Sequence, residues 1–112
     1  MRLTHSLSLA ILGLALTSTS RAQQALSADA THGKELFESK NCSLCHNADS
    51  EEKKIGPGLK GLYARGTMAD GTKVTDASIT DRIVNGKAPM PPYKDTLSDA
   101  EIKQVVEYLK TL

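Results

Sequence analysis

The pentapeptide C-S-L-C-H at residues 42–46 constrains this chain more than any other stretch. Cys42 and Cys45 are the only cysteines among the 112 residues, and His46 directly follows the second one. Side chains three positions apart meet on one face of a helical turn. The pattern therefore indicates a site for one chemical group that two thiols and an imidazole can reach together.

Three interpretations of this pentapeptide compete with covalent haem attachment. A zinc site needs about four ligands, and the sequence has no second C-x-x-C. A thioredoxin-type redox pair is expected beside a βαβ pattern, which the sequence lacks. A disulfide suits an oxidising compartment, but a bridge over so short a loop stabilises little and leaves His46 unexplained.

Covalent attachment of haem c accounts for all three residues, because C-x-x-C-H is the pattern of that attachment. The thiols of Cys42 and Cys45 can bond to the two vinyl groups at one porphyrin edge, which brings His46 under the iron. The composition agrees, since only 4% of the residues are aromatic and Trp is absent. A small domain with so thin a core often depends on a bound group. We therefore predict one covalently bound haem c, with His46 as an axial iron ligand.

Residues 1–22 have the pattern of a cleaved secretory signal. A cationic start precedes a largely apolar run of ten residues at 7–16, and small polar residues then lead to Ala22. A membrane anchor is the alternative, but an anchor needs roughly 20 apolar residues, and no later segment is apolar enough to span a bilayer. We expect export, cleavage of residues 1–22, a single domain over residues 23–112, and no stable membrane insertion afterwards.

The chain left after cleavage is nearly neutral. Removal of residues 1–22 from the 112 leaves 90 and takes away Arg2 and Arg21, so that 12 of the 14 Lys and Arg remain against 13 Asp and Glu. This net charge of −1 provides no basic stripe for phosphates, which argues against nucleic acid as a partner. Nothing in the sequence indicates more than a monomer.

The hydrophobic pattern predicts helices and no strand. The first helix is expected to begin at Asp29, as its N-cap, and to run to Lys40. A short helical turn is expected at residues 59–63, inside a loop that carries five of the eight glycines. A further helix is expected at residues 76–85, with Asp76 as its N-cap and Gly86 as a left-handed stop.

The last helix has the clearest signature in the sequence. Ser98 and Glu101 form a capping box, and Leu97 can pack onto Ile102 as a hydrophobic staple. Apolar residues then recur at helical spacing as far as Leu112. The fold class that follows is all-α, with short helices and long loops that wrap around a cofactor.

A second axial iron ligand is predicted at Met90. This methionine lies in A-P-M-P-P-Y at residues 88–93, where three prolines rigidify the backbone. A thioether is a weak ligand, so a rigid loop lowers the entropy cost of presenting it. The alternatives are Met68 in a glycine-rich turn, His32 near the attachment segment, or an open iron face. Met/His ligation raises the reduction potential of a haem.

These motifs resemble those of the class I c-type cytochromes, above all the short single-haem soluble proteins of bacteria and algae. The resemblance covers residues 29–112 and rests on C-S-L-C-H, on G-P-G-L-K-G-L-Y-A-R at 56–65 and on P-M-P-P-Y at 89–93. It implies the small cytochrome c fold, with three to five short helices and long loops wrapped around one covalently attached haem. The segment from His46 to Met90 is shorter than in the mitochondrial type, which fits the compact bacterial kind.

The resemblance also implies roles for residues around the haem. The Pro57 carbonyl would accept a hydrogen bond from the His46 ring and thereby orient the imidazole. Leu59 would pack on the ring face, and Arg65 would reach a haem propionate. The first helix would cross the last one at Gly33.

Two classes of function are compatible with such a site. In a carrier, six-coordinate iron leaves no position for a substrate, so one-electron transfer is the chemistry that remains. In an enzyme or gas sensor, Met90 would be displaced from the iron, but the sequence shows no His, Arg or carboxylate constellation near Met90 for such chemistry. We therefore expect an electron-transfer protein without substrate chemistry of its own.

The expected location is the periplasm, with the thylakoid lumen or secretion as alternatives. The expected partners are redox proteins: a donor dehydrogenase or cytochrome complex, and an acceptor oxidase or photosynthetic centre. Lys40, Lys87 and Lys94 flank the attachment and methionine segments and could steer docking to an acidic partner. The simpler interpretation is that they are scattered, solvated lysines.

Overall fold

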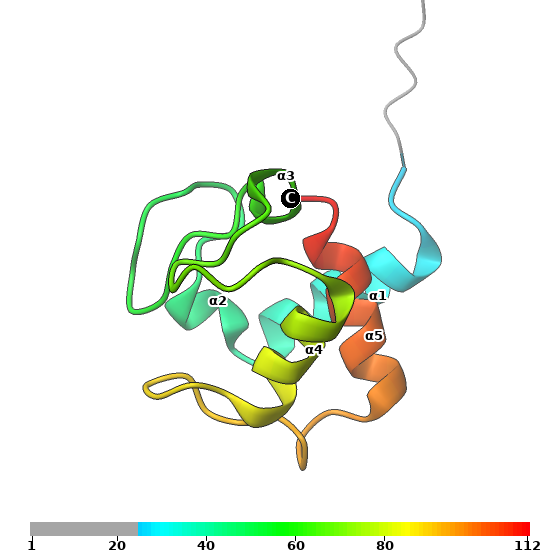
Figure 1. Ribbon diagram of the computed structural model, residues 1–112. Helices are drawn as coiled ribbons and strands as arrows, with labels where there is room; N and C mark the ends of the chain where they lie inside the picture. The colour runs from blue at the N-terminus through cyan, green and yellow to red at the C-terminus, as the bar shows by residue number, and fades with distance from the viewer. Residues whose placement is uncertain (1–24) are drawn as a thin grey trace, which may run out of the picture.

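Five α-helices and long connecting loops make up residues 25–112, the part of the chain that the structure, a computed structural model, describes (Figure 1). The helices are α1 (Ala28–Ser39), α2 (Cys42–Cys45), α3 (Leu62–Arg65), α4 (Asp76–Asn85) and α5 (Asp99–Leu109). Within these residues there is no strand, only isolated bridges that pair Thr67 with Lys73 and Lys87 with Met90. The predicted all-α fold is confirmed. The predicted secretory signal over residues 1–22 lies outside the described residues.

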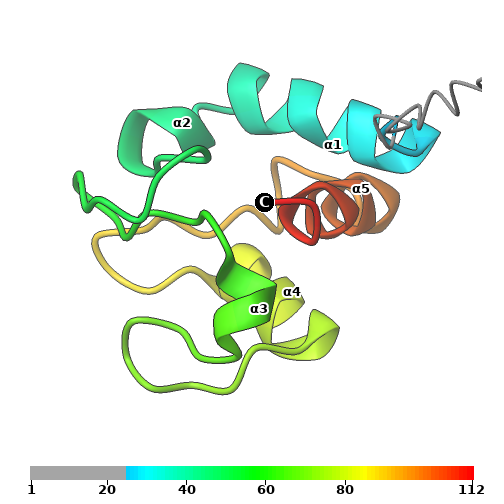
Figure 2. The same ribbon diagram turned by 90° about the horizontal axis from the view of Figure 1, so that it is seen from above.

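Helices α1 and α5 form the most extensive helix contact, and they lie side by side in both views (Figure 1 and Figure 2). They cross at Gly33, where an added Cβ would collide with the carbonyl group of Gln104 and lie 2.9 Å from the Cβ of Tyr108. Next to the crossing, the rings of Phe37 and Tyr108 make an edge-to-face contact with centroids 5.5 Å apart. Glycine is needed at this position because the missing side chain lets the two backbones approach closely.

Both acidic residues predicted as N-caps lie instead inside the first turn of their helices. Ser27 caps α1, with its side chain accepting a hydrogen bond from the Ala30 N–H at 3.1 Å. Thr75 caps α4 and forms a reciprocal capping box with Ser78. The predictions for Asp29 and Asp76 were therefore wrong by one or two residues. A carboxylate in the first turn still stabilises the helix, because it complements the positive end of the helix dipole.

The short helix α3 begins later than the predicted turn at residues 59–63. Gly61 has a φ of +70° and cannot lie inside a right-handed helix, so the helix begins at Leu62. A second glycine with positive φ, Gly66, ends it. Gly86 ends α4 as predicted, but its φ of +65° is combined with a ψ of −176°, so its backbone is not in the left-handed helical conformation.

The C-terminal helix matches its prediction closely. The Ser98 hydroxyl accepts a hydrogen bond from the Glu101 N–H, and the Glu101 carboxylate accepts one from the Ser98 N–H. Leu97 and Ile102 are both buried in the core, as expected of a hydrophobic staple. The buried core is formed mainly by α5, α4 and the inner face of α1, and consists of Phe37, Leu59, Leu62, Ile79, Ile83, Leu97, Ile102, Val105, Val106, Tyr108 and Leu109.

A polar network ties together the ends of α3, α4 and α5. The Tyr63 hydroxyl donates a hydrogen bond to Asp76 at 3.0 Å, and the Lys110 ammonium contacts Asp76 at 2.7 Å and Glu107 at 2.8 Å. Burial of the ring and the hydrogen bond to Asp76 raise the pKa of Tyr63 to about 12. The hydrogen bond from Lys110 lowers the pKa of Asp76. None of the helices in the described residues is long and apolar enough to cross a membrane.

A methyl group at residue 33 should weaken the contact between α1 and α5. We expect Gly33→Ala to lower the free energy of unfolding by about 1–3 kcal/mol, because the new Cβ can fit only if the helices move apart. Chemical denaturation of the haem-loaded protein measures this change. The neighbouring exposed position provides the control: Lys34→Ala should change stability by less than about 0.5 kcal/mol. Equal stability of both variants would contradict the close crossing.

Stability should fall as the pH rises from about 10 to about 12. Tyr63 loses its proton near pH 10 in the unfolded chain and near pH 12 in the folded one, so only the native state holds this proton across that window. Solvent screening keeps the effect small, since the ring is only partly buried. Urea unfolding between pH 9 and pH 12 should show a shallower fall for Tyr63→Phe than for the unmodified protein. If the free energy of unfolding falls equally steeply with pH in both proteins, Tyr63 is not the group responsible for the fall.

Candidate functional site: an apolar cavity between a histidine and a methionine

A cavity of about 480 Å³ lies between the loops and the inner faces of α4 and α5. Its wall contains residues from all five helices and from the loops before and after α3. From α2 only its first residue, Cys42, lines the cavity. Most of the surface is apolar, and the polar groups lie at separate points on it. The lining residues are Phe37, Cys42, His46, Glu51, Lys53, Pro57, Gly58, Leu59, Leu62, Arg65, Thr67, Met68, Ala69, Ile79, Arg82, Ile83, Met90, Val105 and Leu109.

The two cysteines lie at the ends of the single helical turn α2, as their spacing predicted. Asn41 precedes this turn with a φ of +65°, a left-handed conformation that asparagine adopts more readily than most residues. Both cysteines are half-buried and neither is in a disulfide. Cys42 lines the cavity, whereas Cys45 is not among the lining residues. Burial raises the pKa of the Cys42 thiol, and the nearby Cys45 adds to this shift.

His46 is held by its own backbone and by the loop that follows it. Its Nδ1 lies 2.8 Å from the Pro57 carbonyl oxygen, the contact that the resemblance implied. Its N–H donates to the Cys42 carbonyl, and the Gly56 N–H donates to the Cys45 carbonyl. When the Nδ1–H donates its hydrogen bond to the Pro57 carbonyl, Nε2 carries no proton and has a free lone pair. This is the form of imidazole that binds a metal.

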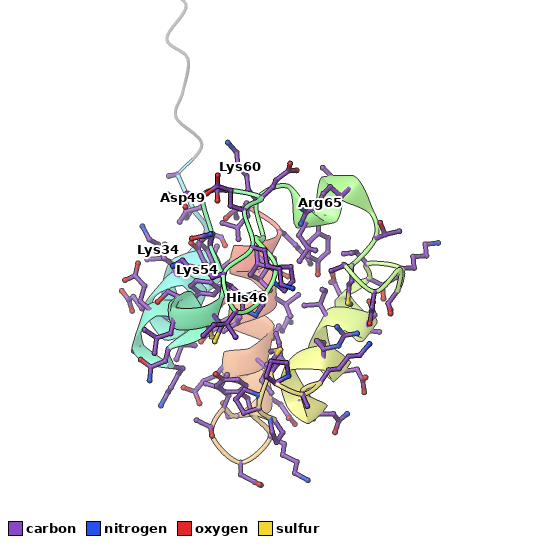
Figure 3. The ribbon with its side chains drawn as sticks, turned by 90° about the vertical axis from the view of Figure 1, so that its left-hand side faces the viewer. Lys34, His46, Asp49, Lys54, Lys60 and Arg65 are labelled. Atoms are coloured by element: carbon purple, nitrogen blue, oxygen red, sulfur yellow. The ribbon has the colours of Figure 1, made fainter. Side chains whose placement is uncertain are left out.

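Gly56 makes room for the His46 ring. A Cβ added to this glycine would lie 2.6 Å from Cε1 and 2.9 Å from Nδ1 of the imidazole. Any side chain at residue 56 would therefore push the ring away from its present position. Figure 3 shows His46 near the middle of this face, with Lys54 on one side and Arg65 of α3 on the other.

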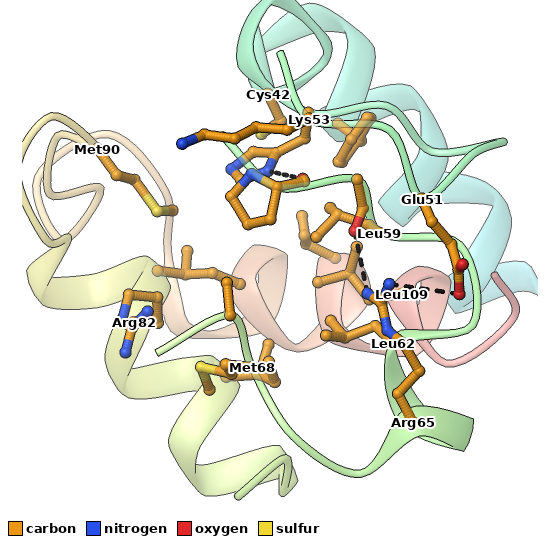
Figure 4. A pocket seen from close by; sticks show the side chains of 18 of the residues that line it. Cys42, Glu51, Lys53, Leu59, Leu62, Arg65, Met68, Arg82, Met90 and Leu109 are labelled. Atoms are coloured by element: carbon orange, nitrogen blue, oxygen red, sulfur yellow. Dashed lines mark hydrogen bonds and ion pairs between the residues drawn. The ribbon is translucent and has the colours of Figure 1, made fainter. Parts of the chain in front are cut away.

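Met90 reaches the cavity from the loop after α4 (Figure 4). Its backbone exchanges two hydrogen bonds with Lys87, at 2.8 and 3.1 Å. The next residues return to α4, because the Tyr93 N–H donates to the Ile83 carbonyl at 3.0 Å. The position of the thioether is therefore determined by main-chain hydrogen bonds as well as by the prolines that the sequence shows.

The alternative ligands from the sequence lie in different places. Met68 also lines the cavity and packs against the core, so the structure brings two thioethers to one site. His32 does not line the cavity. It is exposed on α1, and its Nδ1 lies 3.5 Å from the side-chain amide of Gln104.

Leu59 and Arg65 both lie on the cavity wall. Leu59 is buried and belongs to the core. The Arg65 guanidinium donates to the Gly58 carbonyl at 3.0 Å and lies 3.6 Å from the Glu51 carboxylate. It is thus a partly exposed cation at the rim, with a carbonyl and a carboxylate as its contacts in this structure.

The sequence analysis missed Arg82, which lines the cavity from α4. A signal for it was present, because Arg82 follows Ile79 by three residues and directly precedes Ile83, and both isoleucines are buried. Spacings of three and four residues share one face of a helix, so this arginine had to lie near the core. Its guanidinium is neutralised by Asp70 at 2.8 Å.

Lys87 is not a free member of a basic rim. Its ammonium contacts the Asp70 carboxylate at 2.6 Å, so its charge is locally compensated. This favours the simpler interpretation of the three lysines near the attachment and methionine segments.

The residues present fit a covalently bound haem. The cavity has an apolar wall for the ring, a cysteine thiol at its edge, an imidazole with one nitrogen free, and a thioether. The would-be Cβ at Gly56 shows that the backbone itself leaves space for the imidazole. Cationic side chains at the wall, among them Arg65, suit the propionates.

Comparison with known proteins gives a consistent result. The family model described as cytochrome C oxidase, cbb3-type, subunit III, matches residues 28–109, which is nearly all of the described chain. The chain is 38% identical to cytochrome c6 of Synechocystis sp. over 85 residues, 76% of this chain and 67% of that protein. It is 34% identical to cytochrome c-551 of Stutzerimonas stutzeri over 102 residues, 88% of this chain and 91% of that protein.

A third relative, cytochrome c2 iso-1 of Magnetospirillum fulvum, is 29% identical over 89 residues, 63% of this chain and 90% of that protein. All three relatives are named as cytochromes, and the family-model match spans the attachment motif and the methionine loop. The all-α fold, the apolar cavity and these comparisons agree on one conclusion. The chain belongs to the cytochrome c family, among the class I c-type cytochromes, and is an electron-transfer protein with one covalently attached haem c rather than an enzyme.

Proposed function

We propose that this chain carries single electrons between redox proteins through haem iron ligated by His46 and Met90. The observation that carries the proposal is that an oriented imidazole and a thioether line one apolar cavity together with Cys42. When bound, the haem supplies a one-electron couple between Fe(II) and Fe(III). The relatives named cytochrome c6, c2 and c-551 support electron transfer as the activity.

The two proposed axial ligands are held by main-chain contacts that need not change with the iron's charge. Pro57 orients the His46 imidazole through a 2.8 Å hydrogen bond, and the paired backbones of Lys87 and Met90 hold the thioether. Because the anchoring partner in each contact is a main-chain group, little rearrangement is needed when an electron arrives or leaves. Fixed ligands of this kind suit a carrier.

We assign the covalent attachment to Cys42 and Cys45. Their helical turn is preceded by a left-handed Asn41, and neither thiol is used in another bond. Around this turn two large apolar side chains are exposed, Leu44 at 66% and Ile55 at 63%. An exposed apolar rim beside the attachment point gives a redox partner a surface on which it can approach the haem edge.

Leu59 and Arg65 complete the proposed site. Leu59 is buried on the wall and supplies an apolar contact for the ring face. Arg65 would exchange its weak contact with Glu51, at 3.6 Å, for a propionate. The Pro57 carbonyl acts through His46, since it determines which nitrogen of the imidazole is free.

We further propose that residues 1–22 are a cleaved export signal and that residues 23–112 form the mature monomeric domain in the periplasm. The cationic start, the largely apolar run at residues 7–16 and the small residues before position 22 support this division. The proposed donors are a dehydrogenase or a cytochrome complex, and the proposed acceptors are an oxidase or a photosynthetic centre.

Replacement of Met90 should open one face of the iron. In the unmodified ferric protein we expect a far-red absorption band from thioether-to-iron charge transfer, which Met90→Ala should abolish. The reduced variant should then bind carbon monoxide readily, and its reduction potential should fall because the thioether favours Fe(II). Met68→Ala is the matched control, since it removes the other thioether of the same cavity. If the band is lost in Met68→Ala and kept in Met90→Ala, then Met68 is the iron ligand and the proposal for Met90 is wrong.

A side chain at residue 56 should disturb the histidine ligand. We expect Gly56→Ala to shift the His46 ring, weaken its hydrogen bond to Pro57 and raise the reduction potential, because that hydrogen bond makes the imidazole a more basic ligand, which favours Fe(III). The proton spectrum of the haem-loaded protein reports the ring position, and a redox titration reports the potential. Exposed Ala69→Gly, which changes a cavity-lining loop residue without adding atoms, serves as the comparison. A Gly56 variant with an unshifted ring signal would argue against the tight fit.

A further inference from the structure

A charged cluster closes the methionine side of the cavity. It joins Asp70 in the glycine-rich loop, Arg82 on α4, and Lys87 at the start of the methionine loop, which we define as residues 86–93. Oδ2 of Asp70 accepts hydrogen bonds from Nη2 of Arg82 at 2.8 Å and from Nζ of Lys87 at 2.6 Å. One carboxylate oxygen thus connects three segments that are separate in the sequence.

The loop around Asp70 orients its carboxylate. Oδ1 accepts a hydrogen bond from the Thr72 N–H at 3.0 Å. Two backbone hydrogen bonds tighten the same turn, from the Met68 N–H to the Thr72 carbonyl at 2.8 Å and from the Gly71 N–H to the Met68 carbonyl at 3.0 Å. Lys87 foremost, and then the Thr72 amide, hold the pKa of Asp70 well below its usual range, so that the carboxylate is charged at neutral pH.

Lys87 transmits this contact to the proposed iron ligand. Its N–H donates to the Met90 carbonyl at 3.1 Å, and the Met90 N–H donates back to the Lys87 carbonyl at 2.8 Å. The loop is tight at this point, because a Cβ added to Gly86 would lie 2.5 Å from the Met90 carbonyl oxygen. A displacement of Lys87 therefore displaces the backbone of Met90 as well.

Arg82 gives Asp70 a second role at the cavity wall. In Figure 4, Arg82 lies between Met90 and Met68 on the α4 side of the cavity. A guanidinium stays protonated in proteins, and an opposite charge lowers the cost of placing it beside an apolar cavity. The Asp70 side chain, which is 26% exposed, provides that charge.

We propose that Asp70 is a positioning residue for the methionine ligand. Its carboxylate holds Lys87 against α4, and Lys87 holds the backbone of Met90. The inference rests on the proposed ligation of iron by Met90. Without the carboxylate, the methionine loop opens more often, the thioether leaves its position more often, and an external ligand gains easier access to the iron.

The test is imidazole binding to the haem-loaded ferric protein, followed by loss of the far-red charge-transfer band. Asp70→Asn keeps the size of the side chain but removes its charge, and we expect imidazole to bind roughly three- to tenfold more tightly. Lys87→Gln should have a similar effect, because it removes the ammonium that contacts Asp70. The Lys87 side chain is exposed, so this change should leave the core intact. The double variant should bind imidazole no more tightly than the stronger single variant, because each single change already removes the contact between Asp70 and Lys87.

Asp81→Asn is the matched control. Asp81 directly precedes Arg82 on α4, is exposed, and accepts a hydrogen bond from the Asn85 side chain of the same helix at 2.8 Å. Its imidazole affinity should equal that of the unmodified protein. Unchanged affinity in Asp70→Asn and in Lys87→Gln, with the far-red band intact in the parent, would overturn the role of Asp70 and leave Met90 as the ligand. Absence of the band in the parent protein would overturn the Met90 ligand, and this inference with it.

Discussion

The fold depends on one apolar surface that serves the core and the haem cavity at the same time. Seven of the eleven buried core side chains also line the cavity: Phe37, Leu59, Leu62, Ile79, Ile83, Val105 and Leu109. Burial of such surface contributes about 25 cal/mol for each Å² removed from water. A bulky apolar group in the cavity would add its own buried surface to this gain, which helps a chain with 4% aromatic residues and long loops to form a stable domain.

The helices form the frame around this surface, and the loops carry the proposed iron ligands. The α1–α5 crossing at Gly33 gives a rigid frame, and the loops bring a polar atom to each side of the cavity. His46 arrives on the loop that carries Gly56 and Pro57, and Met90 arrives on the loop that leaves α4. Because backbone groups orient both side chains, the proposed ligands hold their positions without a supporting set of buried polar side chains, of which the described residues contain none.

Local signals predicted the helices well and their first residues less well. The bounds of α4 and the capping box of α5 agree with the sequence analysis, because hydrophobic spacing and caps act within a few residues. The caps of α1 and α4 were misassigned, since serine, threonine and aspartate compete for the same place and only the backbone angles decide between them. The turn at residues 59–63 was placed too early, because a left-handed Gly61 looks the same in a sequence as any other glycine.

The sequence by itself determined the haem attachment motif, the histidine, the prolines around Met90 and the all-α class, because each depends on residue type and short spacing. The tertiary structure alone decided that Gly56 makes room for an imidazole, and that Asp70 reaches Arg82 across 12 positions and Lys87 across 17. Those contacts join segments whose separation in the chain carries no periodic signal. They exist only because the glycine-rich loop, α4 and the methionine loop fold around the same apolar cavity.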